Sequence, residues 1–175
     1  MRVSLPGWVM RATVVLCCLL DSSAPACGVP IISDSNGFED IPWGTILSEG
    51  EHFTKVEDSG RLQIYERNGR PPLLGITPVD SMRFTTFEKK FGRVTVRYSG
   101  KETHDELLTY LQSNYGPLDR TPGQITVGPV KVYAWHGFHT EVTLRFETRL
   151  GHGIIFFESR MLPEKLVDET ALTAF

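Results

Sequence analysis

Apolar and polar positions alternate along much of the chain, and this pattern predicts a fold rich in short β-strands. Leu62 and Ile64, for example, alternate with Gln63 and Tyr65, which is the period of a half-buried strand. The pair Asn68-Gly69 directly after them predicts a turn. Along the whole chain, strands are expected over 38–45, 62–65, 73–77, 82–87, 93–99, 130–134, 142–146 and 154–157.

The segments between these strands predict hairpins. A loop over 88–92 joins one pair, and turns over 136–139 and 150–153 join the last three strands into a meander. Pro71 and Pro72 cannot donate the hydrogen bonds of a strand ladder. The strand that follows them is therefore expected to start late or to lie at a sheet edge.

One helix is predicted clearly, over the residues between Thr103 and Gly116. Thr103 and Glu106 have the spacing of a capping box, in which each side chain bonds the backbone N–H of the other residue. Gly116 and Pro117 are residues that commonly end a helix. The apolar stripe at helical spacing consists of Leu107, Leu108, Leu111 and Tyr115.

Two further helices are expected. Thr45 or Ser48 is suited to cap a short helix that continues through Phe53. Pro163 is suited to the first position of another, and Leu166, Val167 and Leu172 provide its apolar side. Together these elements predict an α+β fold, in which about three helices pack on one face of an antiparallel sheet of hairpins and a meander. Residues 37–175 are expected to form a single α+β domain.

The start of the chain has the pattern of a secretory signal peptide. Arg2 and Arg11 supply positive charge, an apolar run occupies 12–20, and Ala24-Pro25-Ala26 offers the small residues of a cleavage site. The apolar run is shorter than the roughly 20 residues that span a bilayer. We therefore expect residues 1–26 to be a removable leader and residues 27–36 to form a polar tether.

Cys27 is the one cysteine expected to remain after cleavage, because Cys17 and Cys18 lie within the leader. A single cysteine cannot form an internal disulfide. The residues before Cys27 resemble a bacterial lipobox, although Ala24 stands where leucine or valine is usual. Two alternatives stay open: Cys27 is acylated in a membrane-anchored lipoprotein, or it is the first residue of a soluble periplasmic protein.

Charge and motifs argue against several kinds of chemistry. The net charge of −3 does not suit an electrostatic binder of nucleic acid. His136 and His139 share one turn and His152 lies in the next, some 25 Å away across about eight residues of strand at roughly 3.3 Å each, which is too far for one zinc ion. The chain has no Gly-x-Ser-x-Gly elbow and no glycine-rich phosphate loop. No catalytic residue, cofactor or metal site is therefore predicted.

The run Gly37-Phe38-x-x-Ile41-Pro42-Trp43-Gly44-Thr45 resembles the opening of a family of uncharacterised exported bacterial proteins, where this pattern precedes a short helix. Tyr65-Glu66-Arg67, the helix end Tyr115-Gly116, and Trp135 before a turn also fit the family. The resemblance implies a small exported α+β domain and brings no known activity. The general shape is also similar to β-lactamase-inhibitor-like envelope modules, which bind other proteins.

These observations favour a non-catalytic envelope protein that binds another envelope protein, with membrane contact only through a lipid on Cys27. Trp43, Tyr133 and Trp135 are the candidate interaction surface, and their alternative role is core packing. Two other functions stay open. A hydrolytic enzyme acting on envelope material would bring scattered carboxylates together only in the fold. A small-ligand carrier would need an enclosed apolar pocket of a few hundred Å³.

Overall fold

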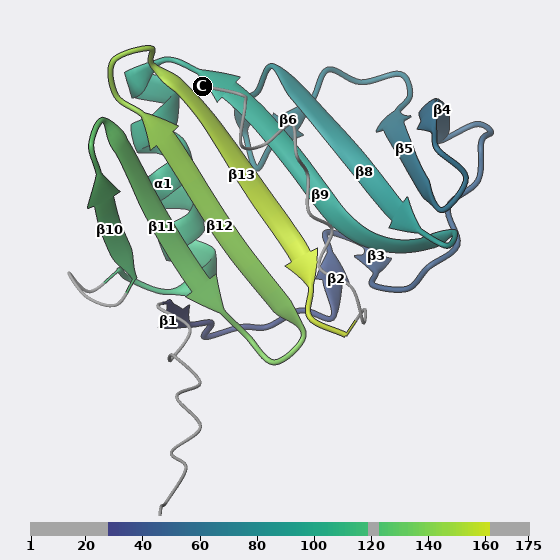
Figure 1. The fold of residues 1–175 in the computed structure, drawn as a ribbon, viewed down its shortest axis with the longest axis horizontal. Helices are drawn as coiled ribbons and strands as arrows, with labels where there is room; N and C mark the ends of the chain where they lie inside the picture. Colours follow the sequence, from purple (N-terminus) through teal and green to yellow (C-terminus); the bar gives the residue numbers. More distant parts are fainter. Residues whose placement is uncertain (1–27, 119–122, 162–175) are drawn as a thin grey trace, which may run out of the picture.

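The computed structural model describes residues 28–118 and 123–161. The expected leader, Cys27 and the helix expected from Pro163 lie outside these ranges. Among the described residues, strands account for 52% and helix for 12%. The predicted α+β fold with about three helices is therefore wrong, since the described chain is a mostly β fold with one helix against its sheet (Figure 1).

The main sheet has nine strands in the order β1-β11-β12-β13-β9-β8-β5-β4, and β10 pairs with β11 on the same edge as β1. Neighbouring strands are antiparallel, apart from the parallel pair β1 and β11. Two small hairpins, β2–β3 and β6–β7, lie outside this sheet. The strands are β1 (Val29–Pro30), β2 (Gly37–Phe38), β3 (Ile41–Pro42), β4 (Phe53–Asp58), β5 (Leu62–Arg67), β6 (Leu73–Leu74), β7 (Thr77–Pro78), β8 (Ser81–Phe87), β9 (Lys90–Ser99), β10 (Gln124–Val127), β11 (Val130–His136), β12 (Thr140–Glu147) and β13 (His152–Ser159).

The short helix expected to end at Phe53 does not form. The carbonyl of Thr45 accepts a hydrogen bond from the backbone N–H of Phe91, the N–H of Gly44 donates to the carbonyl of Phe91, and Ile46 forms an isolated bridge with Lys90. These backbone groups are therefore used by the sheet rather than by a helix. Gly50, which would cost a helix about 1 kcal/mol relative to alanine, lies in the turn that leads into β4.

The single strand expected over 38–45 is a tight hairpin of β2 and β3. Glu39 has a φ of 51° at its turn, a left-handed conformation that few residues other than glycine adopt. The expected core contacts of this segment are nevertheless present. Phe38 and Trp43 are buried, and Ile41 packs against the core.

The helix α1 (Lys101–Tyr115) is confirmed, but its predicted capping box is wrong. The helix begins two residues before Thr103, at a turn where Gly100 has a φ of 99° and its backbone N–H bonds Gly151. No side chain caps this end. Thr103 and Glu106 thus lie within the helix, whereas its predicted end at Gly116 is correct.

The core lies between α1 and the face of the sheet that it covers. Leu107 and Leu111 of the predicted stripe are fully buried. In β11, Tyr133 and Trp135 face this core, and the alternating residues Val130, Val132 and Ala134 are on the other face. Among the described residues, no helix is long and apolar enough to cross a membrane.

The start of the described chain is attached to the sheet and is not a free tether. Val29 and Pro30 pair with the end of β11. Ile32 donates a backbone hydrogen bond to Tyr115 at the end of α1, and Asp34 accepts one from the backbone of His139. The segment 28–36 therefore joins the helix layer to the β11–β12 turn.

The strand expected over 73–77 is interrupted at Gly75, which has a φ of 64°. The result is the hairpin β6–β7, in which Leu73 pairs with Pro78. The double proline before it explains why this segment stays outside the main sheet, since proline cannot complete a central ladder. The hairpin instead lies next to α1.

Candidate functional site

The three aromatic residues proposed as an interaction surface lie inside the protein. The exposed fractions are 9% for Trp43, 4% for Tyr133 and 0% for Trp135. Both indole N–H groups have internal partners, with Trp43 bonding the hydroxyl of Thr140 at 2.9 Å and Trp135 bonding the carbonyl of Gly116 at 2.9 Å. Core packing, the alternative role, is the one observed for these residues.

The histidines of the two turns lie at opposite ends of β12. His136 pairs with Glu141 near one end of this strand, whereas His152 pairs with Glu147 at the other. His139 lies near His136 in the first turn. Within the described part of the chain, no group of three or more histidine, cysteine or acidic residues is placed to hold a metal ion.

A buried histidine that sequence reasoning missed, His104, lies on the core-facing side of α1. The Nδ1 atom of His104 is 2.7 Å from the hydroxyl oxygen of Tyr98, and its ring stacks on Phe146 at 3.9 Å. Burial lowers the pKa of His104 to about 4 and raises that of Tyr98. Both side chains are almost fully buried, so we assign this pair to the structure of the core and not to chemistry.

The most exposed large apolar side chain among the described residues lies at the tip of the β6–β7 hairpin. Ile76 is 94% exposed. It lines an open groove of about 1210 Å³ between the hairpin and α1, together with Pro78 and Tyr110. Ile76, Pro78 and Tyr110 together give this groove contiguous apolar surface, the kind of surface that marks an interaction site.

Contacts with the helix hold the hairpin in place. Gly75 lies so close to Tyr110 that a Cβ atom at this position would be 2.6 Å from the ring. Thr77 donates a hydrogen bond to the carboxylate of Glu106 at 3.2 Å. Ile76 is therefore presented by an anchored turn, which limits the entropy lost when a partner binds.

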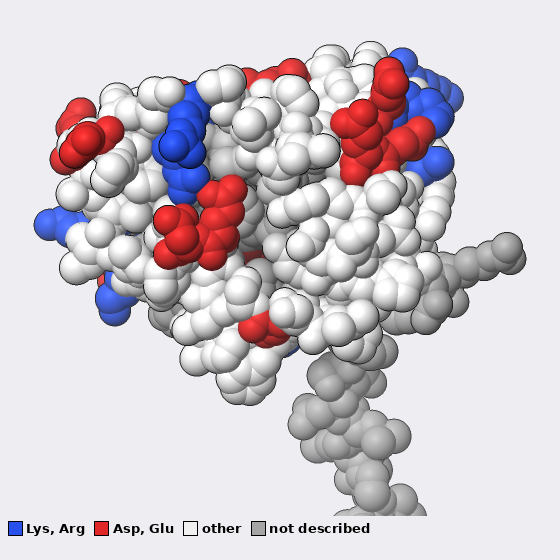
Figure 2. Space-filling view, turned by 180° about the vertical axis from the view of Figure 1, so that it is seen from behind, with Lys and Arg blue, Asp and Glu red and all other residues white. Residues whose placement is uncertain are grey.

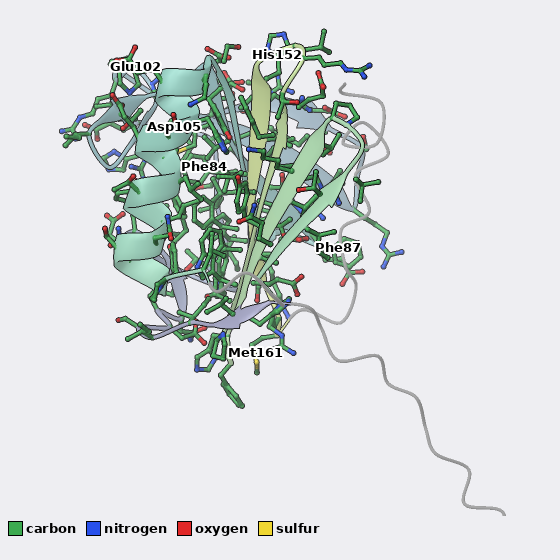
Figure 3. The ribbon with its side chains drawn as sticks, turned by 90° about the vertical axis from the view of Figure 1, so that its left-hand side faces the viewer. Phe84, Phe87, Glu102, Asp105, His152 and Met161 are labelled. Atoms are coloured by element: carbon green, nitrogen blue, oxygen red, sulfur yellow. The ribbon has the colours of Figure 1, made fainter. Side chains whose placement is uncertain are left out.

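The helix wall of the groove is acidic. Glu102, Asp105 and Glu106 line it, together with one basic residue, Lys101. Lys101 forms an ion pair with Asp105 and lowers the pKa of that carboxyl group by hydrogen bonding. Glu102 and Asp105 lie on the first turns of the helix (Figure 3), and the view from behind shows acidic side chains next to basic ones on this side of the molecule (Figure 2).

A second hollow, of about 460 Å³, lies on the other side of the hairpin. Arg67 lines this hollow and forms an ion pair with Glu39 at 2.8 Å. Its guanidinium lies 5.2 Å from the centre of the Phe84 ring. Arg70 also lines it and forms no ion pair with the described residues. The hairpin thus separates an acidic groove from a hollow of mixed charge, which is lined by two arginines and by Glu39, Glu66 and Asp80.

Comparisons of this chain with protein-family models, with curated proteins and with solved structures find no match. The resemblance to an exported bacterial family therefore stays a prediction. The groove itself was missed by sequence reasoning. The run Pro71-Pro72-Leu73-Leu74-Gly75-Ile76 offered one usable indication, an isoleucine after a glycine in a segment where prolines prevent a regular strand.

Proposed function

We propose that this protein is a binding module that takes a segment of another protein in the groove between α1 and the β6–β7 hairpin. The observation that carries the proposal is Ile76, which is 94% exposed on an anchored turn beside that groove. An apolar side chain of this size in water gains roughly 1.5–3 kcal/mol when a partner buries it. Binding is the function that such an arrangement serves best.

The walls of the groove favour a partner of a particular chemistry. Pro78 and Tyr110 offer apolar surface, and Glu102 and Glu106 offer carboxylates on the adjacent helix wall. The complementary segment carries a lysine or arginine close to a large apolar residue, because charge complementarity guides both orientation and partner choice. The enclosed apolar pocket that a small-ligand carrier requires is a poorer description of this open groove.

Replacement of Ile76 by aspartate is expected to weaken binding of such a segment at least tenfold. Peptides selected from a random display library against the purified chain are expected to contain a basic residue beside an apolar one, and their affinity is measured by fluorescence anisotropy. Leu150→Asp is the matched control, since Leu150 is 58% exposed in the distant β12–β13 turn. Peptides that lack basic residues, or that bind Ile76→Asp as well as the parent, would contradict the proposal.

We also propose that the protein is exported and acts in the bacterial envelope, on the basis of its leader-like first 26 residues. If Cys27 is acylated, the form purified from membranes has an intact mass that begins at Cys27 and includes acyl chains. Cys27→Ser is expected to move the protein into the soluble fraction. An unmodified chain in the soluble fraction of the parent strain would show that the protein is not lipid-anchored.

A further inference from the structure

The face of the sheet opposite α1 carries a second, smaller group of buried apolar side chains. Ile154 and Phe156 of β13 form it, with exposed fractions of 1% and 5%. Phe87, at the end of β8, lies on the same side (Figure 3). In the described part of the chain, α1 covers only the other face of the sheet (Figures 1 and 3).

Arginines surround these apolar residues. Arg97 of β9 and Arg145 of β12 are the direct neighbours of Ile154 across the sheet. The guanidinium groups of Arg93 and Arg145 lie 5.4 and 5.8 Å from the centre of the Phe156 ring. The centre of this face is therefore both apolar and basic, a combination that suits an anionic, partly apolar segment packed against it.

Only one of these arginines is neutralised within the described residues. Arg93 donates two hydrogen bonds to a single oxygen of Glu158, at 3.0 and 2.6 Å. Arg97 and Arg145 form no ion pair with any carboxylate in the ranges that the structure describes. Charges held beside an apolar surface gain most when a carboxylate pairs with them there, since the local dielectric is low.

The apolar surface continues along the same row of the sheet. Val132 of β11 is the neighbour of Arg145, and Ile125 of β10 is the neighbour of Val132. Ile125 is 46% exposed. An occupant centred on β13 can therefore extend across β12 and β11 and bury further apolar side chains.

We propose that residues 162–175 of this chain dock on this face and neutralise Arg97 and Arg145. The segment begins directly after Met161, which lies two residues beyond the end of β13. This strand carries Ile154 and Phe156. Its large apolar residues are Leu162, Leu166, Val167, Leu172 and Phe175, and its acidic residues are Glu164, Asp168 and Glu169. It carries a single basic residue, Lys165.

The length of the segment is sufficient for this docking. Each extended residue spans about 3.3 Å, whereas neighbouring strands are about 4.8 Å apart. A few residues therefore suffice to pass from the end of β13 over β12 or β9. The chemistry and the starting point of this segment together make it a better occupant than a second copy of the chain or a separate acidic protein.

Intramolecular cross-linking tests this docking in the full chain. A photoreactive benzoylphenylalanine at Thr143, on the same face beside Phe156, is expected to cross-link to residues 162–175. The same group at Thr109, exposed on α1, is the matched control and is expected to give at least fivefold less of this product. Mass spectrometry of the digested chain identifies the joined peptides.

Mixing chains labelled with ¹⁴N and ¹⁵N separates the possible occupants. Cross-links within one chain support the proposal, whereas hybrid peptides show that a second copy occupies the face and overturn it. Absence of the cross-link at Thr143, or equal yields at Thr143 and Thr109, also overturns it.

The role of charge has its own test. Asp168→Lys combined with Glu169→Lys is expected to lower the cross-link yield from Thr143 at least fivefold. Glu49→Lys combined with Glu51→Lys makes the same charge change on exposed residues before β4, and it is expected to leave the yield unchanged. Equal yields in both double variants would overturn the pairing of the segment with Arg97 and Arg145.

Discussion

Replacement of Trp135 by alanine is expected to lower the free energy of unfolding by about 3–5 kcal/mol. The side chain is fully buried, and its indole N–H donates to the carbonyl of Gly116 at the end of α1. Alanine leaves a cavity in the core and removes the partner of that carbonyl. Urea denaturation followed by circular dichroism measures the loss.

A milder variant separates the two contributions at this position. Trp135→Phe retains most of the apolar contact but not the hydrogen bond to Gly116, and the bond itself is worth about 1 kcal/mol. The loss is therefore expected to be clearly smaller than for alanine. A surface residue would change stability by only about 0.5 kcal/mol, so a loss of that size for Trp135→Ala would contradict the buried position.

Stability is expected to fall as the pH is lowered from about 6.5 towards 4, because of His104. Burial lowers the pKa of this side chain from 6.5 to about 4 in the folded protein. In that interval the unfolded chain binds a proton that the folded chain excludes, so acid favours unfolding. The neutral His104 contributes its full stabilisation above pH 6.5. The loss of folding free energy grows below that pH and reaches on the order of 3 kcal/mol by pH 4.

Variants at two histidines test this origin of the pH dependence. His104→Gln, which offers Tyr98 an amide in place of the ring, is expected to flatten the fall in the free energy of unfolding between pH 7 and 4. His152→Gln, at an exposed position beside Ser99, is expected to retain it. If the two variants have the same slope as the parent protein, His104 is not the group responsible.

Local pattern was sufficient for most of the longer strands, although not for β4, and for the helix. Alternation in the sequence located β5, β8 and the meander of β11, β12 and β13, and helical spacing located α1 with its end at Gly116. These elements have many residues of one period, so each local choice agrees with the final structure. The sequence was least informative where a contact with a distant segment competes with a local preference.

The start of α1 shows such a competition. Thr103 and Glu106 match a capping box, yet the chain leaves β9 at Gly100 and turns directly into the helix. A local hydrogen-bond motif is worth only about 1 kcal/mol, and the position of Gly100 against the β12–β13 turn overrides it. The segment at Thr45 fails as a helix for a similar reason, because the Thr45 carbonyl and the Gly44 N–H form backbone hydrogen bonds with distant Phe91.

The sequence by itself determined the positions of β5, β8, β9, β11, β12 and β13, where the one described helix ends and that Phe38 is buried, since these follow from periods and residue types along one stretch of chain. It did not predict β1, β4 or β10, and it left the position of Trp43 open. Only the tertiary structure decided that Trp135 is internal and that Ile76 is exposed. Exposure depends on which distant segments come to lie over a side chain, and here that is set by the contact of Gly75 with Tyr110 and by the order of strands in the sheet. The groove exists only because residues more than twenty positions apart are brought together there.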